Sequence, residues 1–65
     1  MKKDLRILRA KYDLTQEALA QKLGVGKASY SRKENGKNPF SVDEVTKLKN
    51  IFSLTDEEVV KIFLT

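Results

Sequence analysis

Apolar residues recur at helical spacing along most of this chain. Leu5, Leu8 and Tyr12 are three and four residues apart, so they fall on one face of a helix that we expect over about residues 3–12. The alternation of apolar and polar positions that indicates a strand is absent from the sequence. The pattern therefore predicts an all-α protein.

Two further helices are expected with a very short connection between them. Thr15 is a favourable N-cap for the second helix, and Gly24 stands where a helix-ending glycine is expected. A third helix is expected from Lys27 to Asn35, closed by Gly36. So short a connection makes the two helices cross steeply, which is typical of a helix-turn-helix unit, here over about residues 15–35. The apolar face of the second helix is formed by Ala18, Leu19 and Leu23.

Two capping boxes predict the remaining helices, over residues 41–52 and 55–64. Each box is a Ser or Thr followed three residues later by a Glu, namely Ser41 with Glu44 and Thr55 with Glu58. Pro39 cannot lie inside a helix, so residues 36–40 are expected to form a loop. The expected buried faces are Val45, Leu48 and Phe52, then Val59, Ile62 and Phe63. The 65 residues therefore predict a single domain, a compact five-helix bundle.

Charge is distributed unevenly between the two parts of the chain. Residues 1–40 carry ten basic and four acidic side chains, a net charge of +6. Residues 41–65 carry three basic and five acidic side chains, a net charge of −2. One basic side suits a protein that binds a polyanion there, whereas a solvated surface with accidental asymmetry explains the charges equally well.

The composition argues against several functions. The chain has no cysteine and no histidine, which removes the usual zinc ligands and the commonest general base. It has no phosphate-binding glycine loop, so we expect neither an enzyme nor a cofactor, metal or small-molecule site. No apolar run approaches the roughly 20 residues of a membrane span. A cytoplasmic protein without a membrane partner is the expectation.

The sequence resembles the Cro/cI-type (XRE family) helix-turn-helix domains of phage and bacterial repressors, over about residues 4–59. Several segments lie in matching register, namely Leu8-Arg9, Leu14-Thr15-Gln16-Glu17, Leu19-Ala20, Leu23-Gly24-Val25, Glu34-Asn35-Gly36-Lys37 and Pro39. The resemblance implies a lambda-repressor-like bundle that binds double-stranded DNA with the helix 27–35 in the major groove. It also implies a transcriptional regulator that is associated with the nucleoid when bound to DNA.

The third helix carries the expected base-reading residues. Ala28, Arg32 and Asn35 share one stripe of this helix, with Lys27 and Ser31 beside it. By the resemblance, Lys27, Ala28 and Arg32 occupy the positions that reach bases. Arg32 can pair with guanine O6 and N7, and Ala28 suits a thymine methyl group. Lys27 could contact either guanine or a phosphate.

Other residues are expected to bind the DNA backbone or to hold the fold. Gln16 begins the second helix, whose N-terminal N–H groups suit a phosphate, and the resemblance implies the same contact. The resemblance adds the turn after the third helix, which binds phosphate through side chains and backbone N–H groups. It also implies a structural ion pair between Arg9 and Glu34. The residues expected at the DNA backbone are Gln16, Ser31, Asn35, Lys37 and Asn38.

Four positions depart from the family pattern, and one of them, Lys49, replaces a small residue. Gly26 replaces the usual Ser or Thr, so the third helix should lack a side-chain cap. Lys33 replaces an inward Ile or Leu, and we expect its methylene stem to cover apolar surface while its ammonium reaches water. Tyr30 replaces an aliphatic residue, and its hydroxyl needs a hydrogen-bond partner or a route to solvent.

The C-terminal segment suggests a partner surface. Its apolar residues exceed what one small core can bury, and exposed apolar patches mark interaction sites. We expect a homodimer, at least on DNA, while core filling with a frayed terminus is the plainer explanation. The alternative function is a protein-interaction module of the antirepressor or antitoxin kind. The candidate dimer surface is Ile51, Val60, Phe63 and Leu64.

Overall fold

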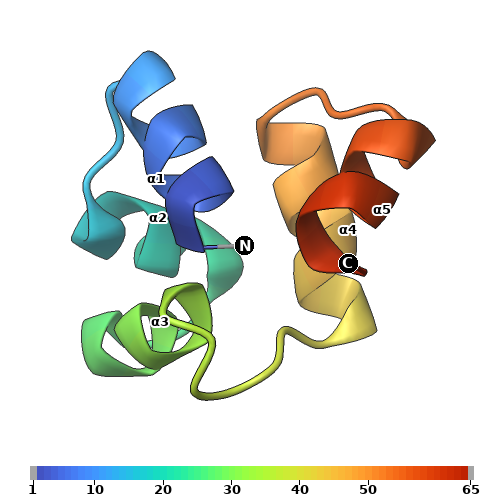
Figure 1. Ribbon diagram of the computed structural model, residues 1–65. Helices are drawn as coiled ribbons and strands as arrows, with labels where there is room; N and C mark the ends of the chain where they lie inside the picture. Colours follow the sequence, from blue (N-terminus) through green and yellow to red (C-terminus); the bar gives the residue numbers. More distant parts are fainter. Residues whose placement is uncertain (1, 65) are drawn as a thin grey trace.

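The computed structural model describes the backbone of residues 2–64 and the side chains of residues 4–64. Within that part, the chain forms five helices and no strand, which confirms the all-α prediction. The molecule measures 28 × 23 × 20 Å. In Figure 1, α1, α2 and α3 form one half and α4 with α5 the other. The helices are α1 (Lys2–Lys11), α2 (Gln16–Leu23), α3 (Lys27–Glu34), α4 (Val42–Ile51) and α5 (Asp56–Phe63).

The predicted caps are present. Thr15 accepts a hydrogen bond from the backbone N–H of Ala18, and both capping boxes are complete, with Ser41 and Thr55 as the N-caps. The expected helix ends differ by about one residue, because cap residues lie just outside the helix. Asn35, for example, is the C-cap of α3 rather than its last residue.

The connection between α2 and α3 depends on Gly24. Gly24 has a φ of +76°, the left-handed region that glycine enters without strain. This conformation lets the N–H of Val25 return to the carbonyl of Ala20 at 3.0 Å, which ends α2 and redirects the chain. The next helix begins directly after Gly26, so α2 and α3 form the predicted helix-turn-helix.

The core lies where the two halves meet. Leu5, Leu19 and Leu48 are fully buried, one from each of α1, α2 and α4, and Ile62 of α5 is buried as well. Residues between the helices complete the packing. Among these residues between helices, Leu54 is buried. Three others are half-buried and pack against the core, namely Leu14, Val25 and Phe40.

Aromatic rings connect the helices through the core. Phe40 lies in the loop after α3. The centre of its ring is 6.1 Å from the centre of the Tyr30 ring and 5.7 Å from that of the Phe63 ring. Tyr12, which shares the expected apolar face with Leu5 and Leu8, is 42% exposed. Its ring still meets Phe52 edge-on at 5.1 Å, and its hydroxyl donates to the Phe52 carbonyl at 3.0 Å. These contacts hold the end of α1 against the end of α4.

The Tyr30 hydroxyl was expected to have a hydrogen-bond partner or a route to solvent, and the described residues provide neither. The side chain is fully buried, and the hydroxyl makes no hydrogen bond with any described residue. Burial raises the pKa of Tyr30, and the nearby Glu34 carboxylate raises it further. The hydroxyl is therefore buried beside the Glu34 carboxylate and the Arg9 guanidinium, but it reaches no described residue with hydrogen-bond geometry, which costs stability.

Replacing Tyr30 with phenylalanine is expected to leave the free energy of unfolding unchanged or to raise it by up to about 1 kcal/mol. The ring would keep its packing, and the buried hydroxyl without a hydrogen bond would be removed. Urea denaturation of Tyr30→Phe beside the original chain measures the difference. A loss of more than about 1 kcal/mol would show that the hydroxyl has a stabilising partner.

Candidate nucleic-acid interface

Helix α3 presents one face to solvent and the other to the core. Lys27, Ala28 and Arg32 are exposed, whereas Tyr30 and Glu34 are fully buried. The side chains of Lys27 and Arg32 make no hydrogen bond or ion pair with any described residue, so both charges are available to a ligand. Ser31 and Asn35 are half-buried at the edge of the exposed face. We call Lys27, Ala28, Ser31, Arg32 and Asn35 the outer stripe of α3.

The N-termini of α2 and α3 lie next to each other. A shallow depression separates them, and its lining residues are Arg9, Thr15, Gln16, Glu17 and Lys27. Gly26 is the N-cap of α3 and provides no side-chain hydrogen bond, as expected. The first-turn N–H groups of α3 therefore have no side-chain acceptor, which suits an incoming anion.

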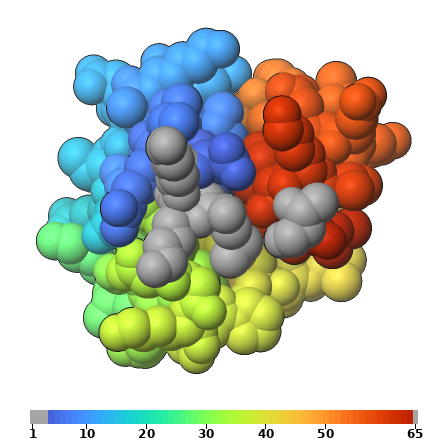
Figure 2. Space-filling model, in the orientation of Figure 1, coloured from blue at the N-terminus to red at the C-terminus, as the bar shows by residue number. Residues whose placement is uncertain are grey.

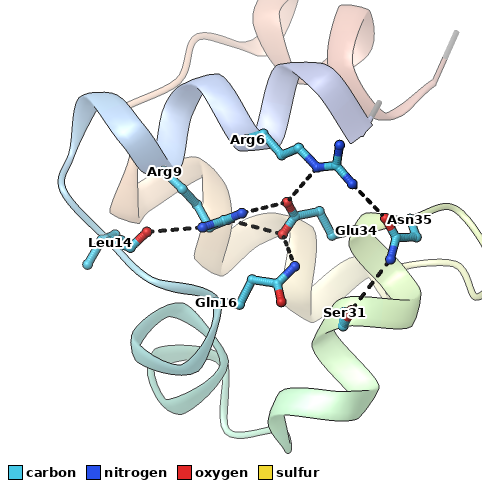
Figure 3. Close-up of polar contacts among 7 residues, drawn as sticks. All are labelled: Arg6, Arg9, Leu14, Gln16, Ser31, Glu34 and Asn35. Carbon is cyan, nitrogen blue, oxygen red and sulfur yellow. Dashed lines mark hydrogen bonds and ion pairs between the residues drawn. The ribbon is translucent and has the colours of Figure 1, made fainter.

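Glu34 connects α3 to α1 and α2. Its carboxylate accepts two hydrogen bonds from the Arg9 guanidinium, at 2.9 and 3.1 Å, and a third from the Gln16 amide at 3.3 Å (Figure 3). The bonds to Arg9 raise the pKa of this guanidinium. The ion pair that the resemblance implies is thus formed, with Glu34 fully buried. Gln16, expected at the DNA backbone, already has its amide oriented by this carboxylate.

Arg6 also belongs to this group, which the sequence analysis did not anticipate. Its guanidinium donates to Asn35 Oδ1 at 3.0 Å, and its Nε lies 3.7 Å from Glu34 Oε1 (Figure 3). The Asn35 amide nitrogen donates in turn to Ser31 Oγ at 3.4 Å. Helical spacing contained a signal, because Arg6 precedes Arg9 by three residues and so lies on the same face of α1. We call Arg6, Arg9, Gln16 and Glu34 the Glu34 cluster.

Lys33 does not send its ammonium into water, so that expectation was wrong. The ammonium donates to Glu44 Oε2 at 2.6 Å, and the side chain is only 17% exposed. Glu44 also accepts from the backbone N–H of Ser41 as part of the capping box. Burial raises the pKa of Glu44, but the bonds from Lys33 and Ser41 outweigh it and lower the pKa overall. Lys33 therefore ties α3 to the start of α4.

The turn after α3 uses its backbone N–H groups internally. Gly36 has a φ of +80°, and the N–H groups of Gly36 and Lys37 donate to carbonyls of α3 at 3.1 and 2.9 Å. These N–H groups close the helix, whereas the resemblance implied that they bind phosphate. The side chains of Lys37 and Asn38 are exposed and remain the donors of this turn.

The candidate dimer surface is divided between core and solvent. Ile51 and Phe63 are half-buried and pack against the core, whereas Val60 and Leu64 are exposed. Leu64 is 73% exposed at the end of the described chain. Figure 2 shows α1, the end of α3 with its following loop, and α5 exposed together on one side of the molecule. The exposed apolar part of the predicted surface is therefore confined to α5 and the residue after it.

No group of three or more acidic side chains that could hold a metal ion occurs among the described residues. No helix in residues 2–64 has the length and apolar character needed to cross a membrane.

Comparison with known families agrees with the geometry of α2 and α3. A family model described as "Helix-turn-helix domain" matches residues 4–61, so the chain belongs to this helix-turn-helix family.

A curated relative carries the same segment. The chain is 42% identical, over 57 residues, to a Pyrococcus furiosus protein named "Putative HTH-type transcriptional regulatory protein". The match covers 88% of this chain and 17% of that relative, so the chain spans only a small part of the relative's length. No solved structure matches the chain significantly.

Proposed function

We propose that this chain is a sequence-specific, double-stranded DNA-binding domain of a Cro/cI-type (XRE family) transcriptional regulator. One observation carries the proposal. The second helix of a helix-turn-helix exposes the side chains of Lys27, Ala28 and Arg32, which have no partner among the described residues, while Glu34 on its other face is held by the body of the domain. Because one face of this helix is fixed to the domain and the other face is exposed, the helix can enter the major groove as a rigid element.

The outer stripe of α3 supports distinct roles for its residues. The planar guanidinium of Arg32 has no partner among the described residues and suits bidentate pairing with a guanine edge. Ala28 offers only a methyl group, which suits contact with a thymine methyl. Lys27 lies beside the depression at the helix N-termini, where either a base or a phosphate is within its reach.

Backbone contacts are proposed on both flanks of α3. On one side Gln16 begins α2, and on the other the turn after α3 contributes side chains. Gln16 donates one amide hydrogen to Glu34 and keeps the second for a phosphate. The remaining proposed backbone residues are Ser31, Asn35, Lys37 and Asn38.

Regulation is proposed to be repression by a homodimer that works in the cytoplasm. Two copies related by a two-fold axis would place their α3 helices about 34–36 Å apart, one turn of DNA. The exposed Val60 and Leu64 are the proposed dimer contacts, with Ile51 and Phe63 supporting them from the core. Sedimentation of the protein with operator DNA tests whether a homodimer binds. A stoichiometry of one protein chain per operator at high protein concentration would refute the dimer.

A protein-interaction module is the second candidate, and an apolar groove favours it. The groove lies between the loop after α3, the start of α4 and the end of α5, and includes Phe40, Val42, Val45, Phe63 and Leu64. Val42 is 82% exposed there. The basic outer stripe lies outside this groove and favours the first candidate.

Salt titration of binding to random-sequence DNA decides between the two. Each phosphate that the protein neutralises should contribute about −0.9 to the slope of log K against log salt concentration. A steep fall is expected if the outer stripe and its flanks meet DNA. No binding at low salt, or a flat response, would favour the protein-interaction module. Selection of bound sequences from a random library then reveals the operator and its symmetry.

A further inference from the structure

We propose that Arg6 of α1 is an additional phosphate-binding residue of the DNA interface, positioned by Asn35 at the end of α3. This inference rests on the proposed function and extends it to a helix outside the helix-turn-helix. No sequence motif assigns a role to Arg6.

The position of Arg6 is set by its contacts with α3. Its guanidinium donates to Asn35 Oδ1 at 3.0 Å, and Asn35 donates to Ser31 Oγ at 3.4 Å. Lys27, Ser31 and Asn35 follow one another at intervals of four residues, so they form one line along α3. Arg6 therefore extends this line beyond the C-terminus of α3 (Figure 3).

The charge of Arg6 is not compensated within the Glu34 cluster. Two guanidinium groups share one carboxylate there, and Arg9 takes both carboxylate oxygens at hydrogen-bonding distance. Arg6 approaches the same carboxylate only at 3.7 Å. The cluster thus carries one excess positive charge, which belongs to the guanidinium with the weaker contact.

Exposure distinguishes the two arginines. The Arg9 side chain is 16% exposed, whereas the Arg6 side chain is 57% exposed. One hydrogen bond to Asn35 leaves most of the five guanidinium N–H donors of Arg6 unused. Asn35 fixes the direction of the Arg6 guanidinium, and the guanidinium is still accessible. It can therefore bind a phosphate oxygen with good geometry. Arg9 has a structural role, and Arg6 has a binding role.

The arrangement also matches the form of a DNA groove. Gln16 and Arg6 contact the Glu34 carboxylate from different helices, with the end of α3 beside them (Figure 3). A helix in the major groove has a phosphate backbone on each side. Because Gln16 and Arg6 contact the same carboxylate, they face the same backbone, and Arg6, next to Asn35, would bind a phosphate close to the one that Gln16 meets.

The experiment replaces Arg6 with glutamine, which keeps much of the stem and an amide donor but removes the charge. The expected slope of log K against log salt concentration is shallower by about 0.9 than that of the original chain. Affinity should fall by a similar factor on every sequence, and the preferred site from library selection should stay the same. Arg6→Lys, which keeps the charge, should keep the slope.

Lys11→Ala is the matched control. It removes one positive charge from the same helix, but Lys11 lies near Glu58 at the start of α5 and not near α3. The slope of log K against log salt concentration for Lys11→Ala should equal that of the original chain. If Arg6→Gln also leaves the slope unchanged while its unfolding midpoint is unaffected, Arg6 does not bind phosphate and the proposal is overturned, although the proposed function survives. If the original chain does not bind DNA at all, both fail.

Discussion

Replacing Glu34 with alanine is expected to lower the free energy of unfolding by about 3–5 kcal/mol. Glu34 is fully buried, and its carboxylate is the acceptor for Arg9 and Gln16. Its removal leaves the Arg9 guanidinium partly buried without a counter-charge and opens a cavity between α1 and α3. A domain of this size has a stability of the same order, so the variant should be largely unfolded at 25 °C.

Urea denaturation followed by circular dichroism measures this loss. Glu17→Ala is the control, because Glu17 is exposed in the first turn of α2 and should cost no more than about 1 kcal/mol. Replacing both Arg9 and Glu34 with apolar residues of similar size should restore much of the stability, since the unpaired charge then disappears. A loss below about 0.5 kcal/mol for Glu34→Ala would contradict the structural role.

The second large effect concerns recognition. Arg32→Ala is expected to remove about 1–3 kcal/mol of discrimination at one base pair of each half-site, roughly 5- to 150-fold. Arg32 is exposed on α3 and has no partner among the described residues, so its loss should leave the fold intact. Competition between the preferred operator and single-base variants of it measures the change.

Lys22→Ala is the matched control for Arg32→Ala. Lys22 is an exposed cation in the last turn of α2 and is not in the outer stripe of α3. Its removal should change affinity little and preference at no base pair. If Arg32→Ala weakens all sequences by the same factor, Arg32 contacts phosphate, and the assignment of base reading to this position is wrong.

The proposed recognition would depend on the same cluster of side chains as the stability of the domain. Glu34 fixes the angle of α3 through Arg9, orients Gln16 at the start of α2, and lies next to Arg6. The proposed DNA contact would therefore require little reordering of these side chains, so less conformational entropy would be lost on binding. A change at Glu34 should consequently affect affinity even under conditions in which the domain stays folded.

Helix positions, caps and the connection between α2 and α3 were predictable from the sequence. Both capping boxes and the helix-ending Gly24 are where the sequence placed them. Such features depend on residues three to five positions apart, so a linear pattern contains the information needed. The ion pair of Arg9 with Glu34 came from the family resemblance and not from local spacing.

Residues outside the helices were harder to predict. Helical periodicity assigns a face only to residues in a helix, and therefore gave no indication that Leu54 is buried or that Phe40 joins Tyr30 to Phe63. Lys33 was misjudged for a related reason. Its partner Glu44 is 11 residues away in the next helix, where the sequence showed only a capping role.

The amino-acid sequence by itself determined five helices, their caps, the helix-turn-helix and the exposed side of α3, because each follows from contacts within one or two helical turns. Only the tertiary structure decided that Arg6 reaches Asn35, that Gln16 is held by Glu34 and that the Tyr30 hydroxyl is buried without a hydrogen bond to any described residue. The first two contacts join residues 29 and 18 positions apart. Whether such side chains meet depends on how the helices pack, which no local pattern specifies.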